Sequence, residues 1–132
     1  MRVLLSIRPA HVANILEGTK RFEFRRKLFT RRDVESVLIY ATMPVGRLVA
    51  EFTIDEILED SPDRLWERTH QASGISRDYY DAYFEGRETA YALGIGELTI
   101  FDEPIAPQDM ISNFTPPQSY RYVSRAQQLS LF

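Results

Sequence analysis

One short basic and aromatic stretch, residues 20–27 (KRFEFRRK), holds the side chains best suited to chemistry. Charged and aromatic residues alternate in it, which predicts a strand with Glu23 and Arg25 on one face and the phenylalanines on the other. A carboxylate beside a guanidinium stays ionised and can accept a hydrogen bond from a nucleobase N–H group, while Lys20 and Arg25 suit phosphate. The stretch therefore predicts a ligand site. The alternative is a structural salt bridge on an exposed strand face.

The charge of the chain is unevenly distributed. Residues 1–32 hold nine Lys and Arg against two acids, and residues 33–132 hold seven against seventeen, so the two parts carry +7 and −10. A basic N-terminal quarter on an acidic body indicates a local anion-binding face. The alternative is a solvated charged face followed by a loop.

Residues for metal and sulfur chemistry are scarce. The chain has no cysteine and two distant histidines, His11 and His70. It therefore forms no disulfide or thiolate nucleophile, and we expect no zinc site. The acids of the middle of the chain are spread along a strand and loop, so we expect a solvated acidic face rather than a nuclease metal site: Glu51, Asp55, Glu56, Glu59 and Asp60. We expect neither a metal nor another cofactor.

The length and the hydropathy of the chain set the class of protein. A chain of 132 residues with 44% hydrophobic residues predicts one domain with a real core. No apolar run approaches the length of a membrane span, and the first residues enter a strand-like run without the pattern of a signal peptide. We therefore expect a cytoplasmic protein with no membrane partner.

The pattern of apolar residues predicts the elements that position these groups. Strands are expected over residues 3–7, 21–25, 36–41, 47–58 and 88–101. Pro9 and Gly18 are placed to start and stop a helix between the first two strands, and two more helices are expected over 62–71 and 76–85. The order β-α-β-β-β-α-α-β predicts an α+β fold, a small mixed β-barrel flanked by short helices.

The helix over 76–85 is rich in aromatic residues. Tyr79 and Tyr83 form one i, i+4 pair, and Tyr80 and Phe84 form another. We expect these rings to pack in the core with hydroxyl groups at its rim. The alternative is that they stack on nucleobases.

Several segments together resemble the ASCH domain of the PUA-like superfamily. They are residues 4–9 (LLSIRP), a helix ending at Gly18, the spaced Lys20, Glu23 and Arg25, and then Tyr40-Ala41, residues 74–76 and residues 116–120. The likeness covers roughly residues 1–122, which we expect to form the domain, with 123–132 as a tail. The resemblance implies a PUA-like β-barrel whose cleft binds RNA, a nucleotide or a modified base. The implied ligand-binding residues are Ser6, Arg8, Lys20, Glu23, Arg25, Arg26 and Tyr40.

The resemblance also raises an enzymatic interpretation. Members of the family include a ribonuclease and an amidohydrolase of acetylated cytidine that uses a Lys, a Thr and a Glu. Lys20 falls on the lysine position, but Glu23 stands where those enzymes have the threonine, and a carboxylate cannot act as that nucleophile. If the domain is catalytic, we expect Lys20 and Glu23 to carry the reaction. Neighbouring arginines would then help to lower the pKa of Lys20.

The last five residues, 128–132 (QLSLF), resemble the peptide by which many bacterial replication and repair proteins dock on the β sliding clamp. Leu129, Leu131 and Phe132 are apolar anchors on a polar tail, Gln128 supplies a hydrogen-bonding amide, and Ser130 is the small polar residue between the leucines. The alternative is that this tail packs on its own domain.

Three functions of different classes follow from these patterns. The first is a module that binds nucleic acid, DNA or RNA, or a modified nucleobase, recruited to DNA replication or repair by the sliding clamp. The second is an enzyme on nucleic acid, either a nuclease such as a ribonuclease or a nucleobase amidohydrolase. The third is a protein that occupies the clamp and inhibits its other partners.

Overall fold

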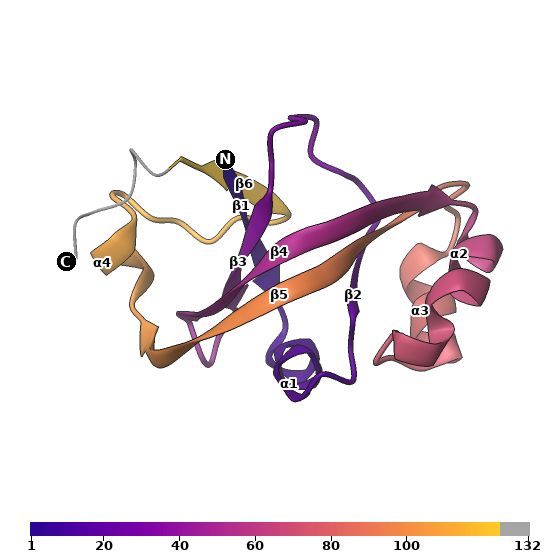
Figure 1. Cartoon of the computed structure of the whole chain (residues 1–132), viewed down its shortest axis with the longest axis horizontal. Coiled ribbons are helices and arrows are strands. Elements are labelled where there is room, and N and C mark those ends of the chain that lie inside the picture. Colours follow the sequence, from indigo (N-terminus) through magenta and orange to yellow (C-terminus); the bar gives the residue numbers. More distant parts are fainter. Residues whose placement is uncertain (125–132) are drawn as a thin grey trace.

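One six-stranded sheet, curled into half a barrel, forms the centre of the molecule, and short helices lie at its ends (Figure 1). The structure is a computed structural model and describes residues 1–124. The strand order is β2-β5-β4-β3-β1-β6. The strands are β1 Arg2–Ile7, β2 Phe22–Arg25, β3 Ser36–Ala41, β4 Arg47–Asp60, β5 Ala90–Ile105 and β6 Tyr120–Val123. The helices are α1 Pro9–Glu17, α2 Pro62–Thr69, a 3₁₀ turn at His70–Ala72, α3 Arg77–Phe84 and α4 Pro107–Met110.

The two longest strands, β4 and β5, are neighbours in the sheet and pair with each other in antiparallel direction. Their pairing shifts register three times, and such bulges increase local twist and bend a strand. Figure 1 shows α2 and α3 at one end of this long ribbon and α4 at the other. The ribbon of β4 and β5 therefore separates α2 and α3 from α4. The start of α1 and strand β2 lie near α3.

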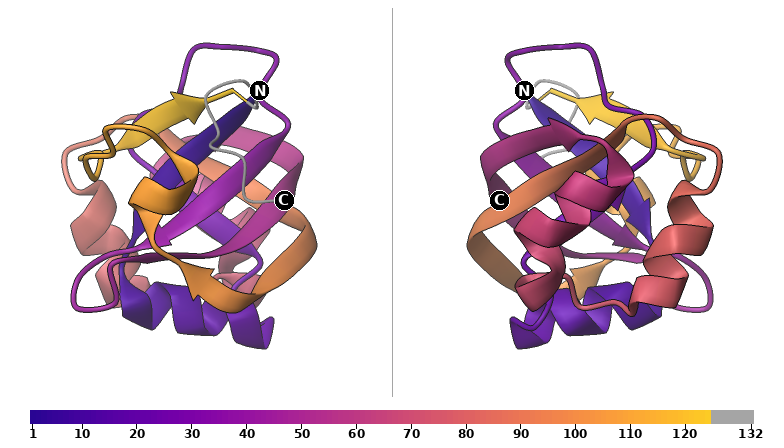
Figure 2. Two further views of the ribbon diagram at one scale, coloured as in Figure 1. Left: turned by 90° about the vertical axis from the view of Figure 1, so that its left-hand side faces the viewer. Right: turned by 90° about the vertical axis from the view of Figure 1, so that its right-hand side faces the viewer.

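The first helix, α1, links strand β1 to strand β2. Pro9 occupies its first turn, and Gly18 ends it in a left-handed conformation with its N–H group bonded to the carbonyls of Asn14 and Ile15. Val12 and Ile15 bury their side chains in the main core, which also takes residues from β1, β3, β4 and β5. Helix α1 is thus held against the core, and Figure 2 shows it in indigo below the curled sheet in both views.

The second and third helices cover the other end of the ribbon. The hydroxyl groups of Ser61 and Ser76 accept hydrogen bonds from the backbone N–H groups of Arg64 and Tyr79, which caps both helices. Tyr80 and Phe84 are buried against Phe24. The expectation that aromatic residues of this helix enter the core is confirmed for this pair.

The expected α+β fold is confirmed, with two additions at the end of the described chain. Strand β6 and the single turn α4 lie beyond the last strand that the sequence predicts, over residues 88–101. Strand β6 pairs antiparallel with β1 and becomes an edge of the sheet. Within residues 1–124, no helix is long and apolar enough to cross a membrane. The clamp-docking expectation concerns residues 128–132, which lie outside the described residues.

Candidate nucleic-acid-binding site

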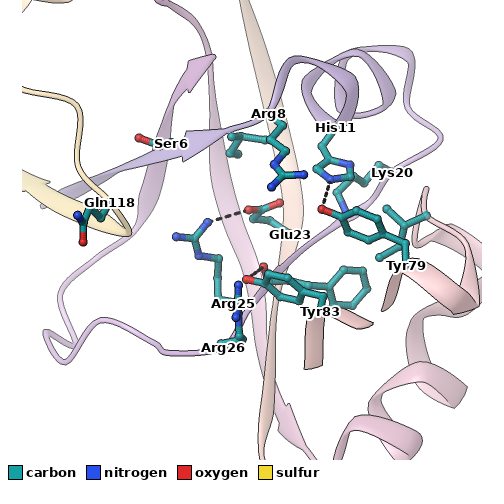
Figure 3. Close-up of a pocket in the computed structure, with 13 residues that line it drawn as sticks. Ser6, Arg8, His11, Lys20, Glu23, Arg25, Arg26, Tyr79, Tyr83 and Gln118 are labelled. Carbon is teal, nitrogen blue, oxygen red and sulfur yellow. Dashed lines mark hydrogen bonds and ion pairs between the residues drawn. The ribbon is translucent and has the colours of Figure 1, made fainter. Parts of the chain in front are cut away.

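A cleft of about 240 Å³ opens where β1 ends, α1 and β2 begin, and α3 passes (Figure 3). This volume is below the roughly 300–1,000 Å³ of pockets that enclose drug-sized ligands, so it suits one nucleobase or nucleoside. The cleft is lined by Ser6, Ile7, Arg8, His11, Lys20, Glu23, Phe24, Arg25, Arg26, Ile75, Tyr79, Tyr83 and Gln118.

A salt bridge joins Glu23 and Arg25 on one face of β2. Arg25 Nη1 donates to Glu23 Oε2 at 3.1 Å, and their side chains are only 13% and 8% exposed respectively. Nη2 of Arg25 also donates to the carbonyl and hydroxyl oxygens of Ser119, at 2.8 and 3.3 Å. Removing a carboxylate and a guanidinium from water is costly, so burial of this pair is weak evidence for a stabilising role. Because Ser119 holds the guanidinium of Arg25 in place, the fixed orientation of the pair suits a ligand site.

Lys20 is almost completely buried at the back of the cleft, with 2% of its surface exposed. Its Nζ atom donates to the carbonyl oxygen of Ser73 at 3.1 Å and lies 4.7 Å from the centre of the Phe24 ring. Burial lowers the pKa of Lys20, and the nearby charge of Glu23 partly opposes this. Burial, rather than repulsion from neighbouring arginines, is therefore the main cause of the lowered pKa.

His11 and Tyr79 form a pair beside Lys20, across the cleft from Arg25 (Figure 3). His11 Nε2 and the Tyr79 hydroxyl oxygen are 3.0 Å apart, and the two rings meet edge to face (Figure 3). The pKa of His11 is lowered by burial and by the positive charges of Lys20 and Arg8, and raised by Glu23. The lowered pKa favours the neutral form of His11, which can accept a proton. Sequence patterns gave no signal for this pair, because its members are 68 residues apart.

Tyr83 completes the aromatic wall. Its hydroxyl group donates to the carbonyl oxygen of Phe24 at 3.2 Å, and the Arg26 guanidinium lies 4.5 Å from the centre of its ring. Tyr79 is 37% exposed. The helix therefore divides its aromatic residues: Tyr80 and Phe84 pack in the core, whereas Tyr79 and Tyr83 line the cleft.

The structure brings together six of the seven domain residues expected to bind a ligand, namely Ser6, Arg8, Lys20, Glu23, Arg25 and Arg26. Tyr40 is not among the residues that line the cleft. It is 4% exposed, and its ring centre lies 5.3 Å from that of Phe114. His11 joins the site without having been expected there. Tyr79 and Tyr83 line it, as the alternative for their helix allowed, and Gln118 comes from the segment 116–120 of the family pattern.

Among residues 1–124, no group of three or more His, Asp or Glu side chains gathers that could hold a metal ion. Glu51, for example, is used structurally. Its carboxylate accepts hydrogen bonds from Arg2 at 3.4 Å and from the Ser36 hydroxyl at 3.0 Å.

Known proteins resemble this chain over most of its length. An ASCH domain-containing ribonuclease from Zymomonas mobilis is 29% identical over 128 residues, which cover 92% of this chain and 84% of the relative. The crystal structure of ASCH from Zymomonas mobilis superimposes with a TM-score of 0.87 at 28% identity, covering 96% of this chain and 90% of that one. A large ribosomal subunit protein of Ureaplasma parvum is 28% identical over 91 residues, but these make up only 29% of its length.

The structural likeness confirms the PUA-like fold of the curled sheet. Residues 5–99 match the ASCH domain. This segment contains the end of β1, all of β2 to β4 and α1 to α3, the first part of β5, and all but one of the residues that line the cleft. The exception is Gln118, which comes from the segment before β6. Because the match covers well over half of the sequence, the chain belongs to the ASCH domain family.

Proposed function

We propose that the cleft binds one nucleotide of single-stranded RNA. The observation that carries this proposal is the grouping of four cationic side chains around one carboxylate and two tyrosines in a space suited to a nucleobase. The cationic residues are Arg8, Lys20, Arg25 and Arg26. RNA-binding sites commonly combine stacking on aromatic rings, hydrogen bonds to base edges and contacts to phosphate.

Each part of the cleft has a distinct task in this proposal. Glu23, oriented by Arg25, accepts hydrogen bonds from amino or ring N–H groups of the base. The rings of Tyr79 and Tyr83 supply stacking surfaces. Arg8 is exposed and forms no ion pair within residues 1–124, so its guanidinium is available for phosphate. Figure 3 shows Arg8 and Arg25 near Glu23, with the tyrosines on the far wall.

Fluorescence anisotropy with labelled single-stranded RNA and DNA of the same sequence tests this function. We expect RNA to bind more tightly than DNA, and the affinity to fall as salt rises because phosphate contacts release counterions. Equal binding of RNA and DNA would contradict the preference for RNA. No binding of either would contradict the proposed function.

The second candidate function is cleavage of RNA. It is favoured by the placement of His11 and Lys20, both with lowered pKa values, in one cleft, and by the ribonuclease name of the relative from Zymomonas mobilis. Neutral His11 would take the proton of a ribose 2′-hydroxyl group, whose oxygen attacks the adjacent phosphorus. The bond to the 5′-oxygen then breaks, and that oxygen takes a proton from the Lys20 ammonium. The products are a 2′,3′-cyclic phosphate and a 5′-hydroxyl end.

A cleavage assay separates the two candidates. If the domain cleaves RNA in this way, it releases cyclic phosphate ends, and Lys20→Ala and His11→Ala each lower the rate by about 10²-fold or more, the usual contribution of an acid or base. Turnover that survives in Lys20→Ala would exclude its role. No turnover by the parent would favour the binding module. Release of acetate from acetylated cytidine would instead support the amidohydrolase, against which Glu23 argues.

Recruitment to the sliding clamp remains a separate proposal, carried by the pattern of residues 128–132 alone. Three apolar side chains and a glutamine suit a small apolar pocket with a polar rim. A protein docked in this way would bring its nucleic-acid cleft to replicating or repaired DNA. A protein that only occupied the clamp would inhibit the other clamp partners.

A further inference from the structure

We propose that the cleft continues into a second nucleotide subsite, so that the domain recognises two successive nucleotides of a single strand. This subsite is a hollow of about 480 Å³ beside the cleft. Two of its own walls come from β3 and the turn after it: Tyr40, Thr42 and Met43. Pro116 and Pro117, from the segment before β6, complete the lining that it does not share with the cleft. The inference rests on the proposed function and extends it from one nucleotide to an oligonucleotide.

The cleft and the hollow meet along a shared boundary. Ser6, Arg8 and Gln118 line both of them. The Ser6 hydroxyl group donates to the carbonyl oxygen of Pro117 at 2.8 Å, which joins the end of β1 to the segment that forms the far wall. A ligand that fills the cleft can therefore continue into the hollow by passing Arg8.

The position and charge of Arg8 fit the phosphate between two nucleosides. Its side chain is exposed, lines both spaces and forms no ion pair within residues 1–124. An internucleotide phosphate carries one negative charge, and a guanidinium can donate two parallel hydrogen bonds to its oxygens. The base on one side of that phosphate would then occupy the cleft, and the base on its other side would occupy the hollow.

The walls of the hollow suit the face of a base more than its edge. Met43 is 74% exposed, an unusual state for a long apolar side chain, and two prolines belong to the same lining. A thioether makes favourable contacts with aromatic rings, and flat apolar surfaces accept any of the four bases. No carboxylate lines the hollow, unlike the cleft, where Glu23 faces the ligand. The second nucleotide is therefore bound with little base preference, whereas the first is selected.

Calorimetry with 2′-O-methyl ligands tests the subsite without cleavage, because the blocked 2′-oxygen cannot attack phosphorus. The probes are the 3′-monophosphates of adenosine and uridine and the corresponding homodinucleotides. We expect the better dinucleotide to bind at least about tenfold more tightly than its mononucleotide, as one further stacked base provides. Met43→Glu places a negative charge in the hollow and should abolish this gain while leaving the affinity for the mononucleotide unchanged.

Val45→Glu is the matched control. Val45 belongs to the same turn and is 40% exposed, but it lines neither the cleft nor the hollow. This variant should keep the full gain. The subsite is overturned if the parent binds mononucleotide and dinucleotide equally, or if Val45→Glu loses as much as Met43→Glu. A parent that binds no mononucleotide or dinucleotide overturns the proposed function itself, and the subsite with it.

Discussion

Gly74 packs directly against the side chain of Lys20, and a methyl group at position 74 would overlap the lysine. The backbone of Gly74 has φ +68°, and its carbonyl oxygen accepts a hydrogen bond at 3.0 Å from the Asn14 side chain of α1. A glycine in the loop before α3 is therefore what allows the buried lysine to lie at the back of the cleft. The contacts of Gly74 link this loop to the lysine and to the first helix.

We predict that Gly74→Ala weakens RNA binding by displacing Lys20. Gly86→Ala is its control, because Gly86 also has a positive φ, +77°, but an added methyl group there meets no atom within 4 Å. Both variants carry the cost of a left-handed alanine, about 1–2 kcal/mol. Gly74→Ala should melt at a lower temperature than Gly86→Ala and bind RNA more weakly. Equal melting temperatures and affinities would show that the contact with Lys20 is unimportant.

We predict that Glu23→Gln and Arg25→Ala each abolish nucleotide binding while the domain stays folded. Glutamine keeps the shape of the side chain but loses the charge that Arg25 holds.

Arg8→Ala should differ in kind, since loss of one phosphate contact reduces the slope of log affinity against log salt by about one. Anisotropy titrations at several salt concentrations measure both effects. Arg31→Ala is the control, because Arg31 is exposed, pairs with Asp33 and lies outside the cleft.

We predict that His11 makes the domain less stable in mild acid. Its pKa in the folded state lies below the ordinary 6.5, so the unfolded chain binds more protons there as the pH falls below 6.5. The folded state loses stability through this group until the pH has passed its lowered pKa. His11→Gln removes the effect, so its melting temperature should fall less than that of the parent between pH 7 and pH 5. Parallel melting curves would contradict this prediction.

We predict that deletion of Leu131 and Phe132 removes binding to a bacterial β clamp. A short peptide that must become ordered on binding gives modest affinity, and its energy is concentrated in a few apolar anchors. The melting temperature of the domain should stay nearly unchanged. A fall of many degrees would show that the tail is part of the core, and clamp binding that survives the deletion would place the contact elsewhere.

Local patterns were enough to predict which residues of β2 share a face. Residues two apart on a strand point the same way, and the structure joins Glu23 and Arg25 at 3.1 Å. The i, i+4 spacing on α3 likewise separated its aromatic residues into two pairs. The spacing does not say which pair is buried, because that depends on the position of Phe24 in a distant strand.

Contacts across the curled sheet could not be predicted from the sequence. His11 meets Tyr79 because the fold brings the start of α1 and the helix α3 to the same cleft. Strand β6 has four residues, too few for a reliable alternating pattern, and it forms because β1 offers an edge for pairing. Tyr40 was associated with the cleft by its place in the family pattern, whereas it packs against Phe114 and lines the neighbouring hollow.

The hydrogen bonds from Arg25 to Ser119 span 94 residues, which has a consequence for the order of assembly. During translation, chains emerge from the ribosome with the N-terminal part first. The segment that holds Arg25 therefore emerges long before its partner, and so do Lys20 and Glu23. Until residues 118 and 119 emerge, the guanidinium lacks its anchor and one wall of the cleft is missing. The cleft is thus completed only after the 94 residues that separate Ser119 from Arg25 have been synthesised.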